Sequence, residues 1–175
     1  MRDLAKNWPA LPDWETHIHE DGGIRVTTVG GLAQHLVSGH LHAFGEGTGA
    51  LGLARHPTAV LRMARDRLLV VDGDPAALRN GWHPEGFAVT DVSSVYHVFE
   101  IAGPGIVALL REALAIDPVI GSPSAAVVFA GIQAVLYRYN DDTVLRLHVE
   151  RGHAAYILDW LRARQDDGRI RDRLE

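Results

Sequence analysis

The sequence contains no cysteine among its 175 residues. A chain without thiols has no disulfide, no thiolate site for zinc or an iron–sulfur cluster, and no cysteine nucleophile. Long hydrophobic runs are also missing, because the longest, residues 125–136, is interrupted by Gln133, and the N-terminus lacks the apolar core of a signal peptide. A membrane span needs about 20 apolar residues. We therefore expect no membrane partner and a cytoplasmic location.

Positive charge is scarce and dispersed along the chain. Lys and Arg number 17 against 22 Asp and Glu, which gives a formal net charge of −5. Proteins that bind nucleic acid usually concentrate basic residues on one face, and this sequence has no such stripe. We expect no nucleic-acid partner. Apolar residues make up 47% of the chain, which is enough for one sizeable core or two small cores that share an interface.

Residues 1–23 show no sustained hydrophobic period and are predicted to form an extended arm that carries Trp8 and Trp14. Tryptophan is enriched at protein interfaces. We expect this arm, together with the glycine-rich residues 39–52, to contact partner subunits. The alternative is that both tryptophans fold back onto the chain's own first subdomain.

Residues 24–90 are predicted to form a first small α+β subdomain. Here β-branched runs indicate strands, whereas a proline after the possible N-cap Asp74 indicates a helix start. The expected elements are a strand at 24–29, a short helix at 31–37, a loop at 39–52, a hairpin of strands at 58–63 and 67–71, and a short helix at 75–80.

Residues 91–164 are predicted to form the second α+β subdomain, which has stronger periodicity. The expected elements are strands at 87–92 and 95–102, a helix from 106, strands at 125–130, 132–139 and 143–149, and a final helix from 154 to about 164. In the strand at 143–149, apolar residues alternate with Arg146 and His148, which predicts one face in the core and one in water. Residues 165–175 are charged and are predicted to be a disordered tail.

The buried positions of this half follow from helical and strand spacing. They are Ile106, Leu109, Leu110, Ala113 and Leu114 in the first helix, Leu145, Leu147 and Val149 in the last strand, and Ala154, Ile157, Trp160 and Leu161 in the final helix. Helices gathered on one face of antiparallel sheets define an α+β fold. We therefore predict two small antiparallel-sheet and helix subdomains.

Residues 47–52 read G-x-G-x-x-G, and Asp72 follows at a spacing typical of dinucleotide-binding folds. That chemistry needs a helix that opens at the glycines, so that amide groups and the helix dipole meet the pyrophosphate. Only four residues separate Gly52 from Pro57. The sequence therefore favours a loop over a dinucleotide site.

Ten histidines suggest metal binding, with His17, His19, His35, His40 and His42 the densest places. Without a thiolate or a definable third ligand, scattered surface histidines are the favoured interpretation.

Two further patterns have both a catalytic or binding interpretation and a structural one. Asp141 and Asp142 could be paired acids, but two acids after Asn140 between strands are typical of a turn. The run from Gly103 to Gly105 could receive an anion at a helix start, but Pro104 removes a donor, which favours a tight turn. No serine, lysine or histidine motif marks a nucleophile. We therefore assign no catalytic or metal-binding residue, and residues for binding a cofactor stay undefined.

Residues 91–164 contain, in order, D-V-S before a strand at Asp91, G-P-G at Gly103, a leucine-rich helix, the pair Asp117-Pro118, and R-x-x-A-x-Y from Arg151 to Tyr156. This order resembles the sarcosine oxidase gamma subunit family, which is similar to the folate-binding domain of glycine-cleavage aminomethyltransferase. Gly105 stands where that family tends to have an acidic residue.

The resemblance implies a non-redox subunit of a heterotetramer that oxidatively demethylates sarcosine or a related N-methyl amine. The products are the amine, formaldehyde or methylene-tetrahydrofolate, and hydrogen peroxide. It implies larger alpha and beta subunits as partners and a small zinc-binding delta subunit, with FAD, FMN, NAD and zinc on those subunits and none on this chain. Tetrahydrofolate is a possible ligand. The alternatives are a free-standing folate-binding or one-carbon-transfer protein, and an accessory domain that binds no folate.

Overall fold

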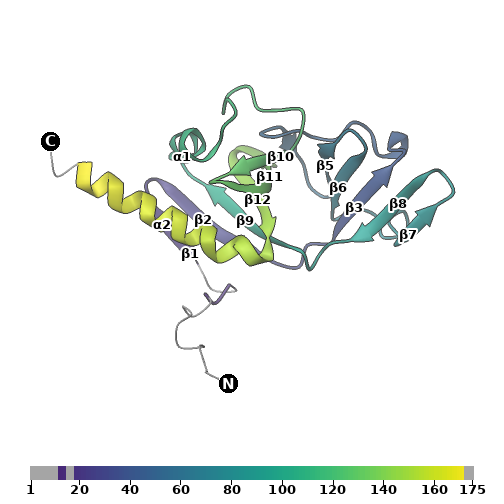
Figure 1. The fold of residues 1–175 in the computed structure, drawn as a ribbon, viewed down its shortest axis with the longest axis horizontal. Coiled ribbons are helices and arrows are strands. Elements are labelled where there is room, and N and C mark those ends of the chain that lie inside the picture. The colour runs from purple at the N-terminus through teal and green to yellow at the C-terminus, as the bar shows by residue number, and fades with distance from the viewer. Residues whose placement is uncertain (1–11, 15–17, 172–175) are drawn as a thin grey trace, which may run out of the picture.

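The computed structural model describes residues 12–14 and 18–171, apart from the side chains of Ile18, Asp21 and residues 165–171. Two sheets lie side by side, and both helices lie with the larger sheet (Figure 1). The β7–β8 hairpin and the C-terminal end of α2 occupy opposite ends of the molecule. The α+β class with two antiparallel sheets is therefore confirmed.

The large sheet has seven strands in the order β1-β2-β9-β12-β11-β10, with β4 also paired to β11. Its pairs are antiparallel except β4 with β11. The strands are β1 (Ile18–Asp21), β2 (Ile24–Val29), β4 (Leu53–Ala54), β9 (Tyr96–Ala102), β10 (Ala126–Phe129), β11 (Ile132–Tyr139) and β12 (Asp141–Glu150).

Helices α1 (Ile106–Ala113) and α2 (Ala154–Arg171) cover one face of the large sheet. The residues expected to be buried in α1, β12 and α2 all belong to this core, with Trp160 partly buried. Their burial follows from the predicted spacing, since residues three or four apart share one helix face. Helix α2 continues to Arg171, beyond its expected end near Arg164.

The small sheet has five strands in the order β5-β6-β3-β8-β7. They are β3 (Gln34–Gly39), β5 (Ala59–Ala64), β6 (Arg67–Val71), β7 (Gly81–His83) and β8 (Phe87–Asp91). Leu61 and Leu69 of this sheet pack against Val135 and Tyr137 on the face of the large sheet opposite the helices. The other face of the small sheet forms a core of its own around Val37 and Phe87.

Two short helices expected in the first half are wrong. The segment expected as a helix at 31–37 contains most of β3, because β6 and β8 pair with it on both sides. At 75–80, Asp74 Oδ1 accepts the amide of Ala76 as an N-cap would, but the chain makes only a turn. One turn closes few hydrogen bonds for the residues it fixes, and Leu78 turns into the core beside Val70.

Sheet membership does not follow the expected division at residue 90. Strand β2, in the expected first subdomain, pairs with β9 of the second, from Arg25 opposite Ala102 to Val29 opposite Val98. Strand β4 likewise joins β11. The two halves of the sequence therefore build the large sheet together.

Candidate functional site

The glycine motif at 47–52 is held by the chain itself. Thr48 bridges Leu61, and Ala50 bridges Ser122. Strand β4 follows the glycines where a dinucleotide site would need a helix. Asp72, the spaced acidic residue, accepts the amide of Ala33 through Oδ1 at 2.9 Å. The loop interpretation is confirmed, and the bridges hold the loop's backbone within the chain. The expected contact of this loop with partner subunits stays a prediction.

The segment Gly103-Pro104-Gly105 makes a tight turn. The Gly105 amide donates to Gly23 O at 2.9 Å, which removes it as an anion donor. Gly103 has φ +123°, in the left-handed region, and a Cβ there would lie 2.3 Å from Gly23 O. This contact explains why glycine stands at the start of α1.

We expect Gly103→Ala to lower the free energy of unfolding by about 2 kcal/mol, because the backbone strain and the clash with Gly23 O occur together. Urea unfolding followed by circular dichroism measures the change. Gly30→Ala is the matched control, since a Cβ there meets nothing within 4 Å. Equal stability of the two variants would contradict the role of Gly103.

The histidines singled out from the sequence do not gather. Among residues 12–14 and 18–171, no three His, Asp or Glu side chains lie close enough together to hold a metal ion. His17 falls outside the described residues. His19 lies on β1, whereas His35 lies on β3 in the other sheet.

Asp141 and Asp142 are the first two residues of β12, which therefore begins two residues before its expected start, directly after the bend at Asn140. Asp141 Oδ1 accepts from both the amide and the hydroxyl of Thr143 at 2.7 Å. These two hydrogen bonds, the hydroxyl's first, lower the pKa of Asp141. The carboxylate therefore stays ionised and caps its own turn, which agrees with the structural interpretation.

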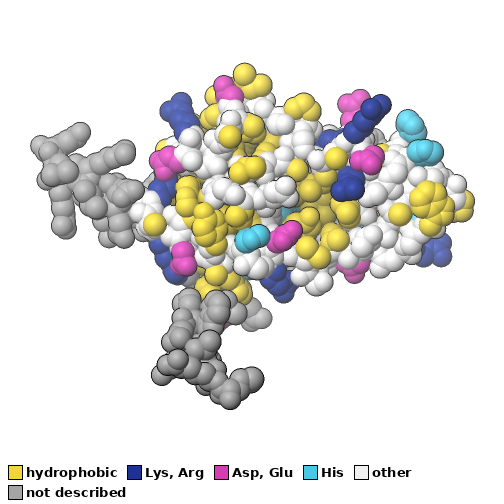
Figure 2. Space-filling view, in the orientation of Figure 1, with side chains coloured by type: hydrophobic (Ala, Val, Ile, Leu, Met, Phe, Trp, Pro, Cys, Tyr) yellow, Lys and Arg dark blue, Asp and Glu magenta, His cyan; other side chains and the backbone are white. Residues whose placement is uncertain are grey.

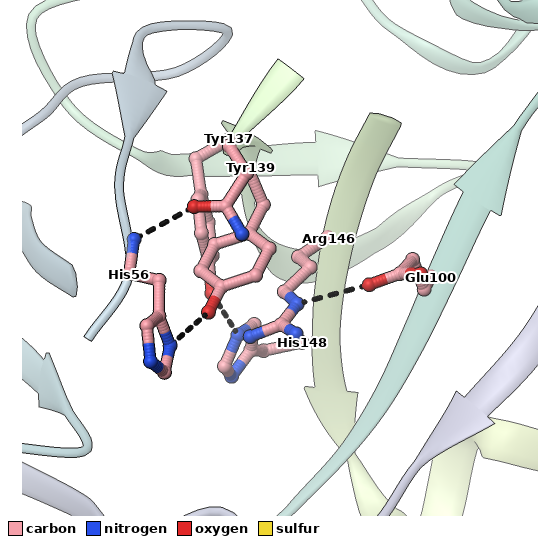
Figure 3. A network of polar contacts seen from close by, with 7 residues as sticks. His56, Glu100, Tyr137, Tyr139, Arg146 and His148 are labelled. Carbon is pink, nitrogen blue, oxygen red and sulfur yellow. Dashed lines mark hydrogen bonds and ion pairs between the residues drawn. The ribbon is translucent and has the colours of Figure 1, made fainter. Parts of the chain in front are cut away.

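A buried polar network joins the two sheets, and no sequence motif indicates it. The hydroxyl of Tyr137 lies 3.1 Å from His148 Nε2 (Figure 3). On the other side of the ring, His148 Nδ1 lies 2.7 Å from Gln34 Oε1. Gln34 Oε1 only accepts, so Nδ1 carries the imidazole proton and the Tyr137 hydroxyl donates to Nε2. Tyr137 and His148 belong to the large sheet and Gln34 to the small one.

Burial fixes the charge state of this network. His148 is fully buried, and burial, followed by the nearby Arg146 charge, lowers its pKa to about 3. Burial also raises the pKa of Tyr137 to about 12. Both groups are therefore neutral at pH 7, and the imidazole is closed off from solvent. Since a substrate has no access to the network, its role is structural: it holds the two sheets together.

A second group of polar residues continues the first along the same face of β11, β12 and β9. The register places Tyr137, Arg146 and Glu100 in one row across these three strands. The Arg146 guanidinium stacks 3.4 Å from the Tyr139 ring centre, and its Nε donates to Glu100 Oε2 at 3.3 Å. His56 contacts the Tyr139 hydroxyl from the β4–β5 connection (Figure 3).

These contacts overturn one expectation about β12. Arg146 and His148 were expected to face water, yet they are 8% and 0% exposed. The reason is that the small sheet covers this face. A buried guanidinium is tolerated here because it has an aromatic face and a carboxylate as partners.

A cavity of about 450 Å³ is lined by residues of the β2–β3 and β8–β9 connections, which run between the sheets, and Trp14 is part of its wall. His97 lines it, with Nε2 3.2 Å from the Thr28 hydroxyl. Burial, followed by the Arg151 charge, lowers the pKa of His97 to about 4. Tyr96 adds a second aromatic wall. The cavity therefore combines aromatic surface, a neutral imidazole and a cation at its mouth.

The position of Trp14 decides part of the arm's predicted role. Its ring lies 4.4 Å from that of His97 and 6.1 Å from that of Phe99, against the helix-side core. Trp14 therefore folds back onto the chain, as in the alternative, but it packs on β9 in the second half and not on the first subdomain. Trp8 lies outside the described residues. Trp82 of β7, which the sequence analysis did not single out, is 72% exposed.

Comparison with known proteins finds similarity at the level of the fold. No family model matches the sequence, and no curated protein matches it. Among solved structures, the fold is similar to a chain of the heterotetrameric sarcosine oxidase from Corynebacterium sp. U-96 in complex with pyrrole 2-carboxylate. The TM-score is 0.63 at 20% sequence identity, over 82% of this chain and 84% of that chain. The chain has the fold of a sarcosine oxidase component.

This fold similarity and the sequence resemblance of residues 91–164 both point to a sarcosine oxidase component. The residues that carry the sequence resemblance make structural contacts within the chain. Gly103 and Gly105 pack against the turn between β1 and β2. Asp117 Oδ1 accepts the amides of the turn that follows it. The Tyr156 hydroxyl donates to Ala130 O at 2.8 Å. Finally, none of the described helices is long and apolar enough to cross a membrane.

Proposed function

We propose that this chain is the non-redox, gamma-type subunit of a cytoplasmic heterotetrameric complex of the sarcosine oxidase type. The observation that carries the proposal is the fold, which matches a chain of a heterotetrameric sarcosine oxidase over most of the length of both chains. In this assignment the complex demethylates sarcosine or a related N-methyl amine. The larger alpha and beta subunits carry FAD, FMN and NAD, and a small delta subunit carries zinc.

The buried polar residues support a structural role over a catalytic one. Tyr137, His148 and Gln34 satisfy one another away from solvent. A general acid or base has to reach the proton that it transfers. The buried imidazole of His148 lacks that access, so the chemistry of the complex is assigned to the other subunits.

Co-expression of this chain with the proteins that the neighbouring reading frames encode tests the proposal. We expect one complex on size-exclusion chromatography that contains this chain and the flavin. We also expect sarcosine-dependent hydrogen peroxide formation to fall when this chain is omitted, because the assembly is then incomplete. A stable monomer that joins no flavin-bearing protein would contradict the assignment.

The cavity beside Trp14 and His97 favours a second candidate, a free-standing protein that binds tetrahydrofolate for one-carbon transfer. A space of about 450 Å³ with aromatic walls is within the size range of small-molecule sites. Calorimetric titration of the isolated chain with tetrahydrofolate separates the two candidates. Saturable binding supports the folate-binding protein, whereas the subunit assignment expects no appreciable heat of binding.

A further inference from the structure

The loop between α1 and β10 holds two large aliphatic side chains in solvent. Val119 and Ile120 are each 82% exposed, which makes them the most exposed large hydrophobic residues of the described chain. Figure 2 shows hydrophobic side chains protruding along the top of the molecule, where Figure 1 draws this loop. Adjacent apolar residues left in water are a common sign of an interaction surface.

The backbone of this loop is fixed before any partner arrives. Asp117 Oδ1 accepts the amide of Val119 at 2.7 Å and that of Ile120 at 3.3 Å, and the Gly121 amide donates to Asp117 O. Ser122 then pairs with Ala50. A surface that is already ordered loses little conformational entropy on binding, which favours affinity.

A groove of about 730 Å³ adjoins the two aliphatic side chains. Its walls include Gly49, Arg62, Arg65 and Glu46. Arg62 is engaged within the chain, since its guanidinium donates to the carbonyls of Gly45, Glu46 and Arg65. Arg65 is exposed and has no ion-pair partner among the described residues. The groove therefore offers one available cation beside an apolar pair.

We propose that Val119, Ile120 and Arg65 form the docking surface for a larger subunit of the complex. This inference rests on the proposed function. The partner that fits is a protein surface with an apolar pocket for the two aliphatic side chains and a carboxylate placed for Arg65. A lipid surface fits less well, because the chain carries a net charge of −5, which anionic headgroups repel, and two side chains bury little area in a bilayer.

The test is co-purification of flavin with the tagged full-length chain from cells that express the whole complex. We expect the double variant Val119→Asp/Ile120→Asp to recover at least ~10-fold less flavin per chain, because two aliphatic side chains lose their apolar pocket and two charges enter it. We expect Arg65→Glu to recover about fivefold less, because the charge pairing is reversed.

Two controls keep the result interpretable. Val107→Asp on α1 places a charge at another exposed valine and should recover flavin as the wild type does. Thermal unfolding of the double variant should match that of the wild type, since both side chains are already in water. If the double variant unfolds like the wild type and recovers as much flavin per chain, the docking surface is wrong but the subunit assignment stands. A wild-type chain that recovers no flavin overturns the subunit assignment together with it.

Two further measurements identify a different occupant. Light scattering of the isolated chain that reports a dimer, lost in the double variant, would overturn the proposal in favour of a second copy of this chain. Co-flotation with vesicles of phosphatidylcholine and anionic phosphatidylserine, lost in the same variant, would overturn it in favour of a lipid surface. If Arg65→Glu recovered as much flavin per chain as the wild type, the proposed pairing of Arg65 with a carboxylate of the partner would be wrong.

Discussion

Lowering the pH from 7 to 5 should reduce the free energy of unfolding by about 2 kcal/mol through His148 alone. Burial lowers the pKa of His148 to about 3 in the folded chain, whereas an unfolded histidine titrates near 6.5. Between these values the unfolded state binds a proton that the folded state does not. The stability is therefore fully present above about pH 6.5 and is lost progressively as the pH falls toward 3.

The triple variant Gln34→Leu/Tyr137→Phe/His148→Leu isolates this effect. It replaces the whole network by apolar groups, so that no buried donor is left unpaired, and we expect stability close to that of the wild type at pH 7. Urea unfolding at pH 7 and pH 5 measures both proteins. On acidification, the free energy of unfolding of the triple variant should fall by about 2 kcal/mol less than that of the wild type. The triple variant should still show the part of the loss that is due to His97, whose pKa is lowered to about 4.

Tyr137→Phe is the companion variant at pH 7. It removes one hydroxyl and leaves His148 Nε2 without its donor in the closed space between the sheets. An unsatisfied buried acceptor costs about 1–3 kcal/mol, so this single change should destabilise the chain more than the triple change does. If the wild type and the triple variant lost the same amount of unfolding free energy between pH 7 and pH 5, His148 would not be the cause of the acid destabilisation.

The network shows what the sequence could and could not predict. The alternation in β12 correctly separated Leu145, Leu147 and Val149 from Arg146 and His148. What covers the second face depends on the small sheet, whose strands lie up to 114 residues away from β12, as in the Gln34–His148 contact. Strand period predicts which residues share a face, but not whether a second layer packs on it.

The first half was less predictable for a related reason. Gln34 to Gly39 has no clear strand period, and pairing with β6 and β8 decides its conformation. The cap at Asp74 was predicted, but the helix was not propagated, because Leu78 is drawn into the core of the small sheet. In short segments such tertiary contacts override local propensity. By contrast, α1 and the first two turns of α2 carry apolar residues at helical spacing, which specifies a buried face without outside information.

The candidate sites also divide into those that local sequence could predict and those that depend on the folded structure. The glycine motif at 47–52 could be interpreted as a loop because the missing helix is a local property of the sequence. The exposed pair Val119 and Ile120 could not be recognised, since in sequence they are two ordinary aliphatic residues after Asp117-Pro118. Their significance comes from exposure, which depends on how the Asp117 turn projects from the folded chain.

The aromatic arm gives the last large effect, tested by two identical substitutions at different places. Trp14→Ala should lower the free energy of unfolding by about 3 kcal/mol, the lower end for loss of a packed aromatic ring. The ring lies against His97 and Phe99 and is only partly buried. Trp82→Ala removes the same side chain from a position that is 72% exposed, and we expect a change within about 0.5 kcal/mol. Urea unfolding of both variants measures the difference.

The same pair of variants also tests the interface role first inferred for the arm. If Trp14 holds the fold, Trp14→Ala should lower the unfolding midpoint of the isolated chain, because the lost contacts are with His97 and Phe99 of the same chain. If instead this variant unfolds like the wild type and fails to co-purify flavin, the ring serves a partner. Deleting residues 1–11 removes Trp8 but keeps Trp14 and β1 (Ile18–Asp21), and loss of the isolated chain's cooperative transition would place this first part of the arm within the fold.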